Sequence, residues 1–189
     1  MKIEVTNTIG YQKSRSVRAC TVALLFIIFS FQLHAQTSRE YIIKAGFLYN
    51  FTQFVDWPSN AFQNAEAPFV IAILGDDPFR AALDTAVAGE KVKGHSIVIE
   101  RYQNVKDIKN CHILFINHKE STRLKEILPA LPSKHILTVS DIPDFATTGG
   151  MIRFITKKNK IKLQINLKAS KEAELIFSSK LLQVADIVR

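Results

Sequence analysis

The stretch FVIAILGDDPFRAALDTAV, residues 69–87, decides the fold class of this chain of 189 residues. Residues 69–74 are a continuous apolar run, which is typical of a strand buried on both faces of a sheet. Gly75 and the residues Asp76-Asp77-Pro78 follow as a turn, and a helical pattern continues to about Val87. A strand, a capped turn and a helix in this order are the repeating unit of parallel α/β sheets.

The same order of segments recurs along the chain. Further strands are predicted at residues 96–101, 112–116 and 136–139, and further helices at 39–57, 105–108, 119–128 and 178–188. We therefore predict one α/β domain, a layered and mostly parallel sheet that is flanked by helices on both faces and ends in an antiparallel hairpin.

The hairpin is predicted from two runs, residues 151–156 and 161–166, the second of which alternates apolar and polar side chains. We place it at the edge of the sheet. A lysine cluster joins the runs and lacks the interleaved aromatic residues of a single-strand nucleic-acid binder. We interpret the cluster as charges that protect a sheet edge from aggregation: Lys157, Lys158, Lys160 and Lys162.

The first 35 residues have the three parts of a secretory signal peptide. Lys13, Arg15 and Arg18 lie just before a 13-residue apolar stretch from Ala19 to Phe31. The stretch is shorter than the roughly 20 residues that a helix needs to span a bilayer. We therefore predict cleavage after Ala35 and no stable membrane insertion afterwards, which leaves residues 36–189 as the exported domain.

The composition is 47% hydrophobic and 22% charged, which excludes disorder, collagen and a coiled coil as descriptions of the whole chain. The net charge of +8 at first suggests nucleic-acid binding. Removal of residues 1–35 leaves 21 basic and 16 acidic residues, a charge of +5. Because an exported protein also does not meet nucleic acid, we predict no such partner.

One cysteine, Cys111, remains after removal of the signal peptide. It cannot form an internal disulfide, and it directly precedes the apolar run of residues 112–116. We predict a buried, unreactive thiol, because free cysteine is among the most buried residue types.

Polar side chains follow two of the predicted strands. Asp76 and Asp77 come after the strand at 69–74, and Ser140 and Asp141 after the strand at 136–139. Carboxyl ends of parallel strands form the crevice where α/β proteins bind ligands, so Asp76, Asp77 and Ser140 are candidate ligand-binding residues. Helix and turn capping explains the same aspartates without a ligand.

The predicted first helix carries more aromatic side chains than one buried stripe requires. Packing under the helix explains most of them, but aromatic residues also dominate protein-binding hot spots. The candidate partner-binding residues are these aromatics together with a loop after the strand at 136–139: Phe47, Tyr49, Trp57, Asp141 and Phe145.

Patterns of catalysis and of cofactor binding are missing from the sequence. The histidines after residue 35 lack metal-ligand spacing, no Gly-x-Ser-x-Gly occurs, and the glycines match neither the dinucleotide fingerprint nor the P-loop. We predict no enzyme activity, no metal and no cofactor.

Eight short motifs in a fixed order resemble the YfiR-like family of exported regulatory proteins. They cover nearly the whole chain after the signal peptide: KAGFLYNF (44–51), FVDWP (54–58), ILGDDPF (73–79), CHILFI (111–116), LTVSD (137–141), GGMI (149–152), IN (165–166) and SSKLL (178–182).

The resemblance implies a periplasmic α/β domain, often a homodimer, without catalytic activity. It also implies inhibition of a membrane-bound diguanylate cyclase through that enzyme's periplasmic sensor region, which lowers cyclic di-GMP and restrains biofilm formation. Another membrane signalling protein, such as a sensor histidine kinase, can replace the cyclase as partner. Family members with disulfides have a partner for the counterpart of Cys111 that this chain lacks. The alternative function is a periplasmic small-ligand-binding protein that uses the crevice at the strand ends.

Overall fold

The computed structural model describes residues 39–158 and 160–188. The predicted signal peptide lies outside these residues, so its cleavage stays a prediction. Within the described ranges, no helix has both the length and the apolar character needed to cross a membrane.

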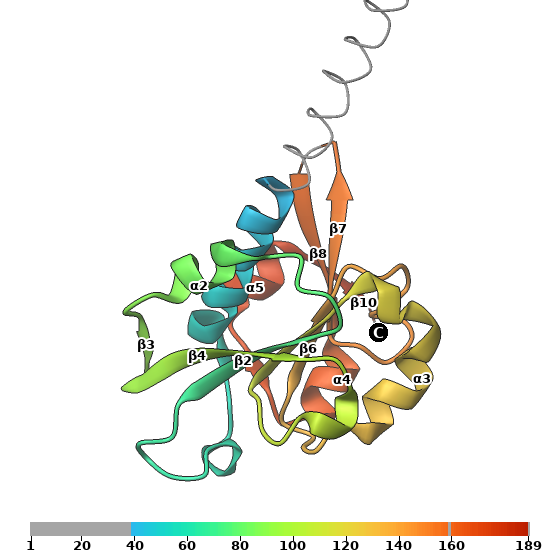
Figure 1. The fold of residues 1–189 in the computed structure, drawn as a ribbon. Coiled ribbons are helices and arrows are strands. Elements are labelled where there is room, and N and C mark those ends of the chain that lie inside the picture. The colour runs from blue at the N-terminus through green and yellow to red at the C-terminus, as the bar shows by residue number, and fades with distance from the viewer. Residues whose placement is uncertain (1–38, 159, 189) are drawn as a thin grey trace, which may run out of the picture. The chain divides into compact units, whose positions relative to one another are not determined.

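An eight-stranded sheet runs through the described residues in the order β10-β8-β7-β6-β5-β2-β4-β3 (Figure 1). The strands from β4 through β2, β5 and β6 to β7 are parallel, whereas β8 is antiparallel to β7. This mostly parallel sheet with an antiparallel hairpin confirms the predicted fold class. The bounds are β2 Phe69–Leu74, β3 Lys91–Val92, β4 His95–Tyr102, β5 Ile113–Ile116, β6 Leu137–Ser140, β7 Ile152–Lys157, β8 Lys160–Asn166 and β10 Ala185–Val188.

Helices cover both faces of the sheet. One face carries a helix described over residues 39–54, called here the N-terminal helix, together with α2 and the α4–α5 region, and the other carries η2 and the η3–α3–η4 segment. The bounds are η1 Ser59–Ala61, α2 Ala81–Val87, η2 Val105–Asp107, η3 His118–Arg123, α3 Leu124–Ile127, η4 Leu128–Ala130, α4 Leu167–Glu172 and α5 Ser179–Gln183. Two short strands, β1 Val55–Asp56 and β9 Ile176–Phe177, pair separately with each other.

The two faces have separate hydrophobic cores, and β2 contributes to both. Ile71 and Ile73 pack toward the N-terminal helix, whereas Val70, Ala72 and Leu74 pack toward the opposite layer. Successive side chains of a strand point to opposite faces, so a run that is apolar at every position must be covered on both sides. All six residues of β2 are buried, as the continuous apolar run predicts.

The order of the strands creates a switch point between β2 and β5. From β2 the chain crosses to β4 on one side of β2, and it then returns to β5 on the other side. The loops that follow β2 and β5 therefore diverge, and in open α/β sheets this is where ligands bind.

The last predicted helix is wrong over its second half. Residues 178–188 were expected to be one helix, but α5 ends at Gln183 and residues 185–188 form β10. β10 pairs in parallel with Leu163–Asn166 of β8. Ile187 and Val188 are β-branched and suit a strand, and pairing with an open sheet edge satisfies more backbone groups than another turn of a short helix.

The predicted place of the hairpin at the sheet edge is also wrong. β10 lies outside β8, so the β7–β8 hairpin is internal to the sheet over the residues that β10 covers. Other differences concern helix type and length. The first helix ends at residue 54 because residues 55–56 pair with β9, residues 105–107 form a 3-10 turn, and the region 118–130 is α-helical only at Leu124–Ile127.

Cys111 is buried, as predicted, with 3% of its surface exposed. Burial raises the pKa of the thiol to about 12, and the nearby Glu100 carboxylate acts in the same direction. The thiolate is the reactive form, so this cysteine is unreactive at neutral pH.

Gly150 lies against the ring of Phe145, and a Cβ built there would be 2.2 Å from Cε1 of that ring. Because Phe145 is completely buried, the ring has no free space to move into. We expect Gly150→Ala to lower the free energy of unfolding by about 2 kcal/mol, as overpacking does. The matched control is Gly46→Ala in the N-terminal helix, where a Cβ meets nothing within 4 Å and where alanine should add about 0.5–1 kcal/mol. Urea unfolding of both variants tests this, and equal effects of the two substitutions would contradict it.

Candidate functional site

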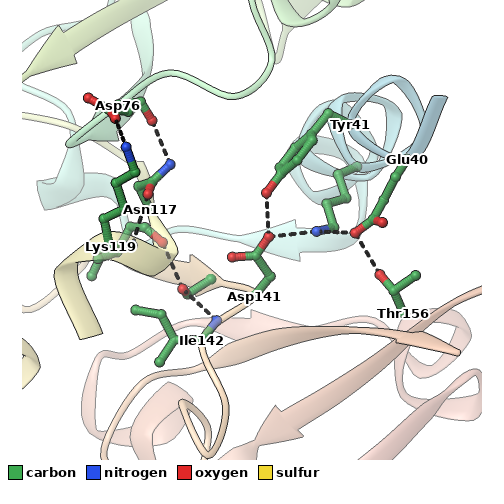
Figure 2. A network of polar contacts seen from close by, with 11 residues as sticks. Glu40, Tyr41, Asp76, Asn117, Lys119, Asp141, Ile142 and Thr156 are labelled. Atoms are coloured by element: carbon green, nitrogen blue, oxygen red, sulfur yellow. Dashed lines mark hydrogen bonds and ion pairs between the residues drawn. The ribbon is translucent and has the colours of Figure 1, made fainter. Parts of the chain in front are cut away.

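Polar side chains gather where β2, β5 and β6 end, and Figure 2 shows them in two groups. One group joins the N-terminal helix to Asp141, the first residue after β6. The other lies at the switch point and joins Asp76, after β2, to Asn117 and Lys119, after β5. Ser140 is the last residue of β6, and Asn117 is the first residue after β5.

Lys44 is the centre of the first group. It lies on the buried side of the N-terminal helix, only 1% exposed. Its Nζ is 2.6 Å from Oδ2 of Asp141 and 2.6 Å from Oε1 of Glu40, one helical turn earlier. The ammonium also lies 4.4 Å from the centre of the Tyr41 ring, a cation–π contact. A buried lysine is stable only with such partners, because an unpaired charge out of water is very unfavourable.

Asp141 receives two hydrogen bonds on one oxygen. Lys44 Nζ and the Tyr41 hydroxyl, at 2.8 Å, both donate to Oδ2. Oδ1 is buried and has no hydrogen-bond partner among the described residues. Burial raises the pKa of Tyr41, and the negative charge of Asp141 raises it further, so this hydroxyl stays a donor.

Glu40 extends the group to the hairpin. Its Oε1 accepts a hydrogen bond of 2.7 Å from the hydroxyl of Thr156 on β7. The N-terminal helix is therefore tied through Glu40, Tyr41 and Lys44 both to the end of β6 and to β7.

The second group lies at the switch point. Asn117 donates through Nδ2 to the backbone oxygen of Asp76, at 2.7 Å, and accepts from the backbone N–H of Lys119. The ammonium of Lys119 lies 2.7 Å from the Asp76 carboxylate in an exposed ion pair. The hydrogen bond and the charge of Lys119 lower the pKa of Asp76.

The side chains of Asp77 and Ser140 form hydrogen bonds with backbone groups of the protein itself. Asp77 Oδ1 accepts from the backbone N–H groups of Phe79 and Arg80, as a turn cap does, and Oδ2 accepts from Arg101. The hydroxyl of Ser140 is completely buried, donates to the backbone oxygen of Ile116 and accepts from the N–H of Ile142. The capping interpretation is thus confirmed for Asp77. It is wrong for Asp76, whose carboxylate accepts from Lys119, and for Asp141, which accepts from Tyr41 and Lys44.

Glu120 fills space beside Gly75, the first residue after β2. A Cβ on Gly75 would lie 3.0 Å from Oε1 of Glu120, whose side chain is 14% exposed and paired with Arg123. Part of the space where α/β proteins bind ligands thus holds side chains of η3. Among the described residues, no group of three or more His, Cys, Asp or Glu side chains is arranged to hold a metal ion.

The candidate partner-binding aromatics differ in exposure. Phe47 is half-buried against Phe51 and Phe154, and Phe145 is completely buried in the opposite core. Tyr49 is partly exposed, and its hydroxyl donates to Glu90 at 2.7 Å. This hydrogen bond raises the pKa of Tyr49.

Trp57 is half-buried and belongs to an aromatic cluster around His112. Its ring meets Phe69 edge-on with 4.9 Å between centroids, and its Nε1 donates to the backbone oxygen of His112. The His112 ring stacks on Phe69 and packs against Phe62. Its Nδ1 accepts from the N–H of Val70 at 3.0 Å, which assigns the proton of the neutral ring to Nε2.

The sequence patterns missed Lys44, Asn117 and Thr156. A signal for Lys44 exists, since it is a lysine on the apolar stripe of a helix and has a glutamate four residues earlier. No comparable signal marks Asn117 or Thr156, because their partners come from distant parts of the chain.

A family model described as YfiR/HmsC-like matches residues 41–186 of the chain. No curated protein matches the sequence.

Lys44→Met removes the buried ammonium and keeps most of the side-chain volume. Asp141 and Glu40 then lose their counter-charge, so we expect the free energy of unfolding to fall by about 3 kcal/mol. Lys119→Met is the matched control, because it breaks an exposed ion pair and should change little. Urea unfolding compares the two variants. Equal losses of free energy of unfolding would show that the buried Lys44 ion pairs stabilise the fold no more than the exposed Lys119 pair does.

His112 predicts a pH dependence of stability. Burial lowers its pKa from 6.5 to about 4. Below pH 6.5 the His112 imidazole is protonated in the unfolded chain, whereas in the folded protein it stays neutral down to about pH 4. The free energy of unfolding therefore falls as the pH decreases across this interval. We expect urea unfolding at successive pH values to show that the free energy of unfolding changes with pH as uptake of about one proton requires. This dependence should be absent from the His112→Gln protein. The same slope in both proteins would assign the effect to other groups.

Proposed function

The chain belongs to the YfiR/HmsC-like family, and on this premise we propose that it is an exported regulator of a membrane signalling protein. The family is periplasmic and regulatory rather than catalytic. The single observation that carries the proposal is the family match over residues 41–186, nearly all of the described chain.

The proposed partner is the periplasmic sensor region of an inner-membrane diguanylate cyclase. Binding favours one conformation of the sensor and so inhibits the cytoplasmic enzyme, because a ligand shifts a conformational equilibrium by its difference in affinity for the two states. Inhibition lowers cyclic di-GMP and restrains biofilm formation. We propose that the regulator acts as a homodimer after its signal peptide, residues 1–35, has been removed.

The proposed contact surface includes Tyr49 and Trp57. Both are partly exposed, and the hydrogen bonds of Tyr49 to Glu90 and of Trp57 to His112 hold the rings in place before binding. Rigid aromatic rings suit a binding hot spot, since little conformational entropy is lost on contact. Asp141, 13% exposed at its side chain, supports the helix beneath this surface. Phe145 is left out because it is completely buried.

The alternative, a small-ligand binder that uses Asp76, Asp77 and Ser140, has weaker support. The hydroxyl of Ser140 and one oxygen of Asp77 already bond the backbone, and Lys119 pairs with Asp76. A ligand would have to displace these interactions, whereas a protein partner needs only the outer surface.

Tyr49→Ala tests the contact surface. We expect it to weaken binding to the cyclase sensor region by tenfold or more, as loss of a hot-spot tyrosine does. Tyr102→Ala is the matched control, because Tyr102 is also a partly exposed tyrosine whose hydroxyl donates to a glutamate, Glu100, but it lies on β4 and packs against the other core.

The measurements are site-specific crosslinking in the periplasm and the cellular level of cyclic di-GMP. Deletion of the gene should raise cyclic di-GMP, the Tyr102→Ala protein should restore the low level, and the Tyr49→Ala protein should not. Unchanged cyclic di-GMP on deletion, with no membrane protein recovered by crosslinking, would falsify the proposed function. If the two variants restore cyclic di-GMP equally, the partner-binding surface does not include Tyr49.

A further inference from the structure

The outer half of the β7–β8 hairpin stands free of the sheet. β6 pairs with β7 only at Ile152 and Arg153, and β10 pairs with β8 only over residues 163–166. The two strands continue to pair with each other as far as Lys157 and Lys160. Figure 1 shows the hairpin extending past its neighbours. Its end carries four lysines, called here the basic tip: Lys157, Lys158, Lys160 and Lys162.

The charges of the basic tip are not neutralised by the domain. All four lysines are exposed, and none forms an ion pair with a carboxylate of residues 39–158 or 160–188. No acidic residue occurs in the sequence from 145 to 171. Lys157 lies directly opposite Lys160 in the hairpin, and like charges in this position destabilise a strand pair.

Edge protection does not account for this arrangement. Edge protection works by charged side chains on the free strand edge, which oppose pairing with another chain. Protection does not require two lysines that face each other, nor a third, Lys158, in the turn, where there is no strand edge. An unfavourable local arrangement that the domain does not compensate is expected where a surface meets an external partner.

Apolar side chains are exposed at the same end of the domain. Ile42 and Ile43 on the N-terminal helix are 56% and 41% exposed. The hydrogen bond from Thr156 to Glu40 holds this part of the helix beside the hairpin. Lysines next to exposed aliphatic side chains are typical of protein surfaces that lie on an anionic bilayer.

We propose that the basic tip binds anionic phospholipid headgroups on the periplasmic face of the inner membrane. The contact is peripheral, with the lysines at the level of the phosphates and Ile42 and Ile43 at the surface. It holds the domain at the membrane after the signal peptide is removed. The proposal does not depend on which membrane protein is the partner.

Vesicle binding tests the proposal, with protein purified from the periplasm and vesicles of phosphatidylethanolamine with phosphatidylglycerol, or of phosphatidylcholine alone. We expect binding only to the anionic vesicles, and weaker binding as salt is added. Each lysine near an anionic surface contributes roughly fivefold in affinity. Replacing all four by glutamine should therefore weaken binding by about 25-fold or more, if at least two touch the surface together.

The matched control variant replaces Lys106, Lys109, Lys125 and Lys168 by glutamine. It has the same net charge, and its lysines are exposed, unpaired among the described residues and outside the hairpin. It should bind anionic vesicles almost as well as the natural protein.

The proposal is overturned if both variants lose vesicle binding equally, if the protein binds phosphatidylcholine vesicles equally well, or if it binds no vesicles at all. Self-association of the tip variant with unchanged vesicle binding would restore edge protection as the explanation. Binding of the tip to an acidic protein domain without vesicle binding would overturn the proposal as well.

Discussion

Lys44 brings a positive charge into the apolar side of the N-terminal helix, where it is stable only because Glu40 and Asp141 each lie 2.6 Å from its ammonium. This requirement sets the rotation and the height of the helix relative to β6. With Lys44 held at Asp141, the buried residues one and two turns later, Leu48 and Phe51, meet the central core. The same rotation leaves Ile42 and Ile43 in solvent. The surface that the helix presents thus depends on the buried ammonium of Lys44 and on its two carboxylate partners.

The ends of the parallel strands have a structural role in this domain. The loops after β2, β5 and β6 are where related architectures bind ligands. Here Asp77 and Ser140 bond the backbone, Asp141 holds the helix, and Glu120 lies beside Gly75. The features open to a partner lie farther out, on the helix and on the β7–β8 hairpin. This division suits a regulator that acts through its surface.

Much of the fold was predictable because its strands carry strong local signals. The runs at 69–74 and 113–116 are apolar at every position, and such runs must be covered on both faces wherever they lie. The burial of Cys111 followed from its place beside one of these runs. Residues 178–188 were mispredicted because a short amphipathic segment suits both a helix and an edge strand, and the free edge of β8 decided between them. The hairpin was misplaced for the same reason, since β10 covers the edge of β8 at residues 163–166.

The sequence by itself determined the class of the fold, the double-sided burial of the central strands and the family to which the chain belongs. These properties depend on residues that are close together in the chain or on the order of short motifs. Only the tertiary structure decided which polar groups meet. Lys44 and Asp141 are 97 positions apart, and Glu40 and Thr156 are 116 apart. No local pattern encodes such pairs, because they form only when the strand order brings the helix, the end of β6 and β7 to the same end of the sheet.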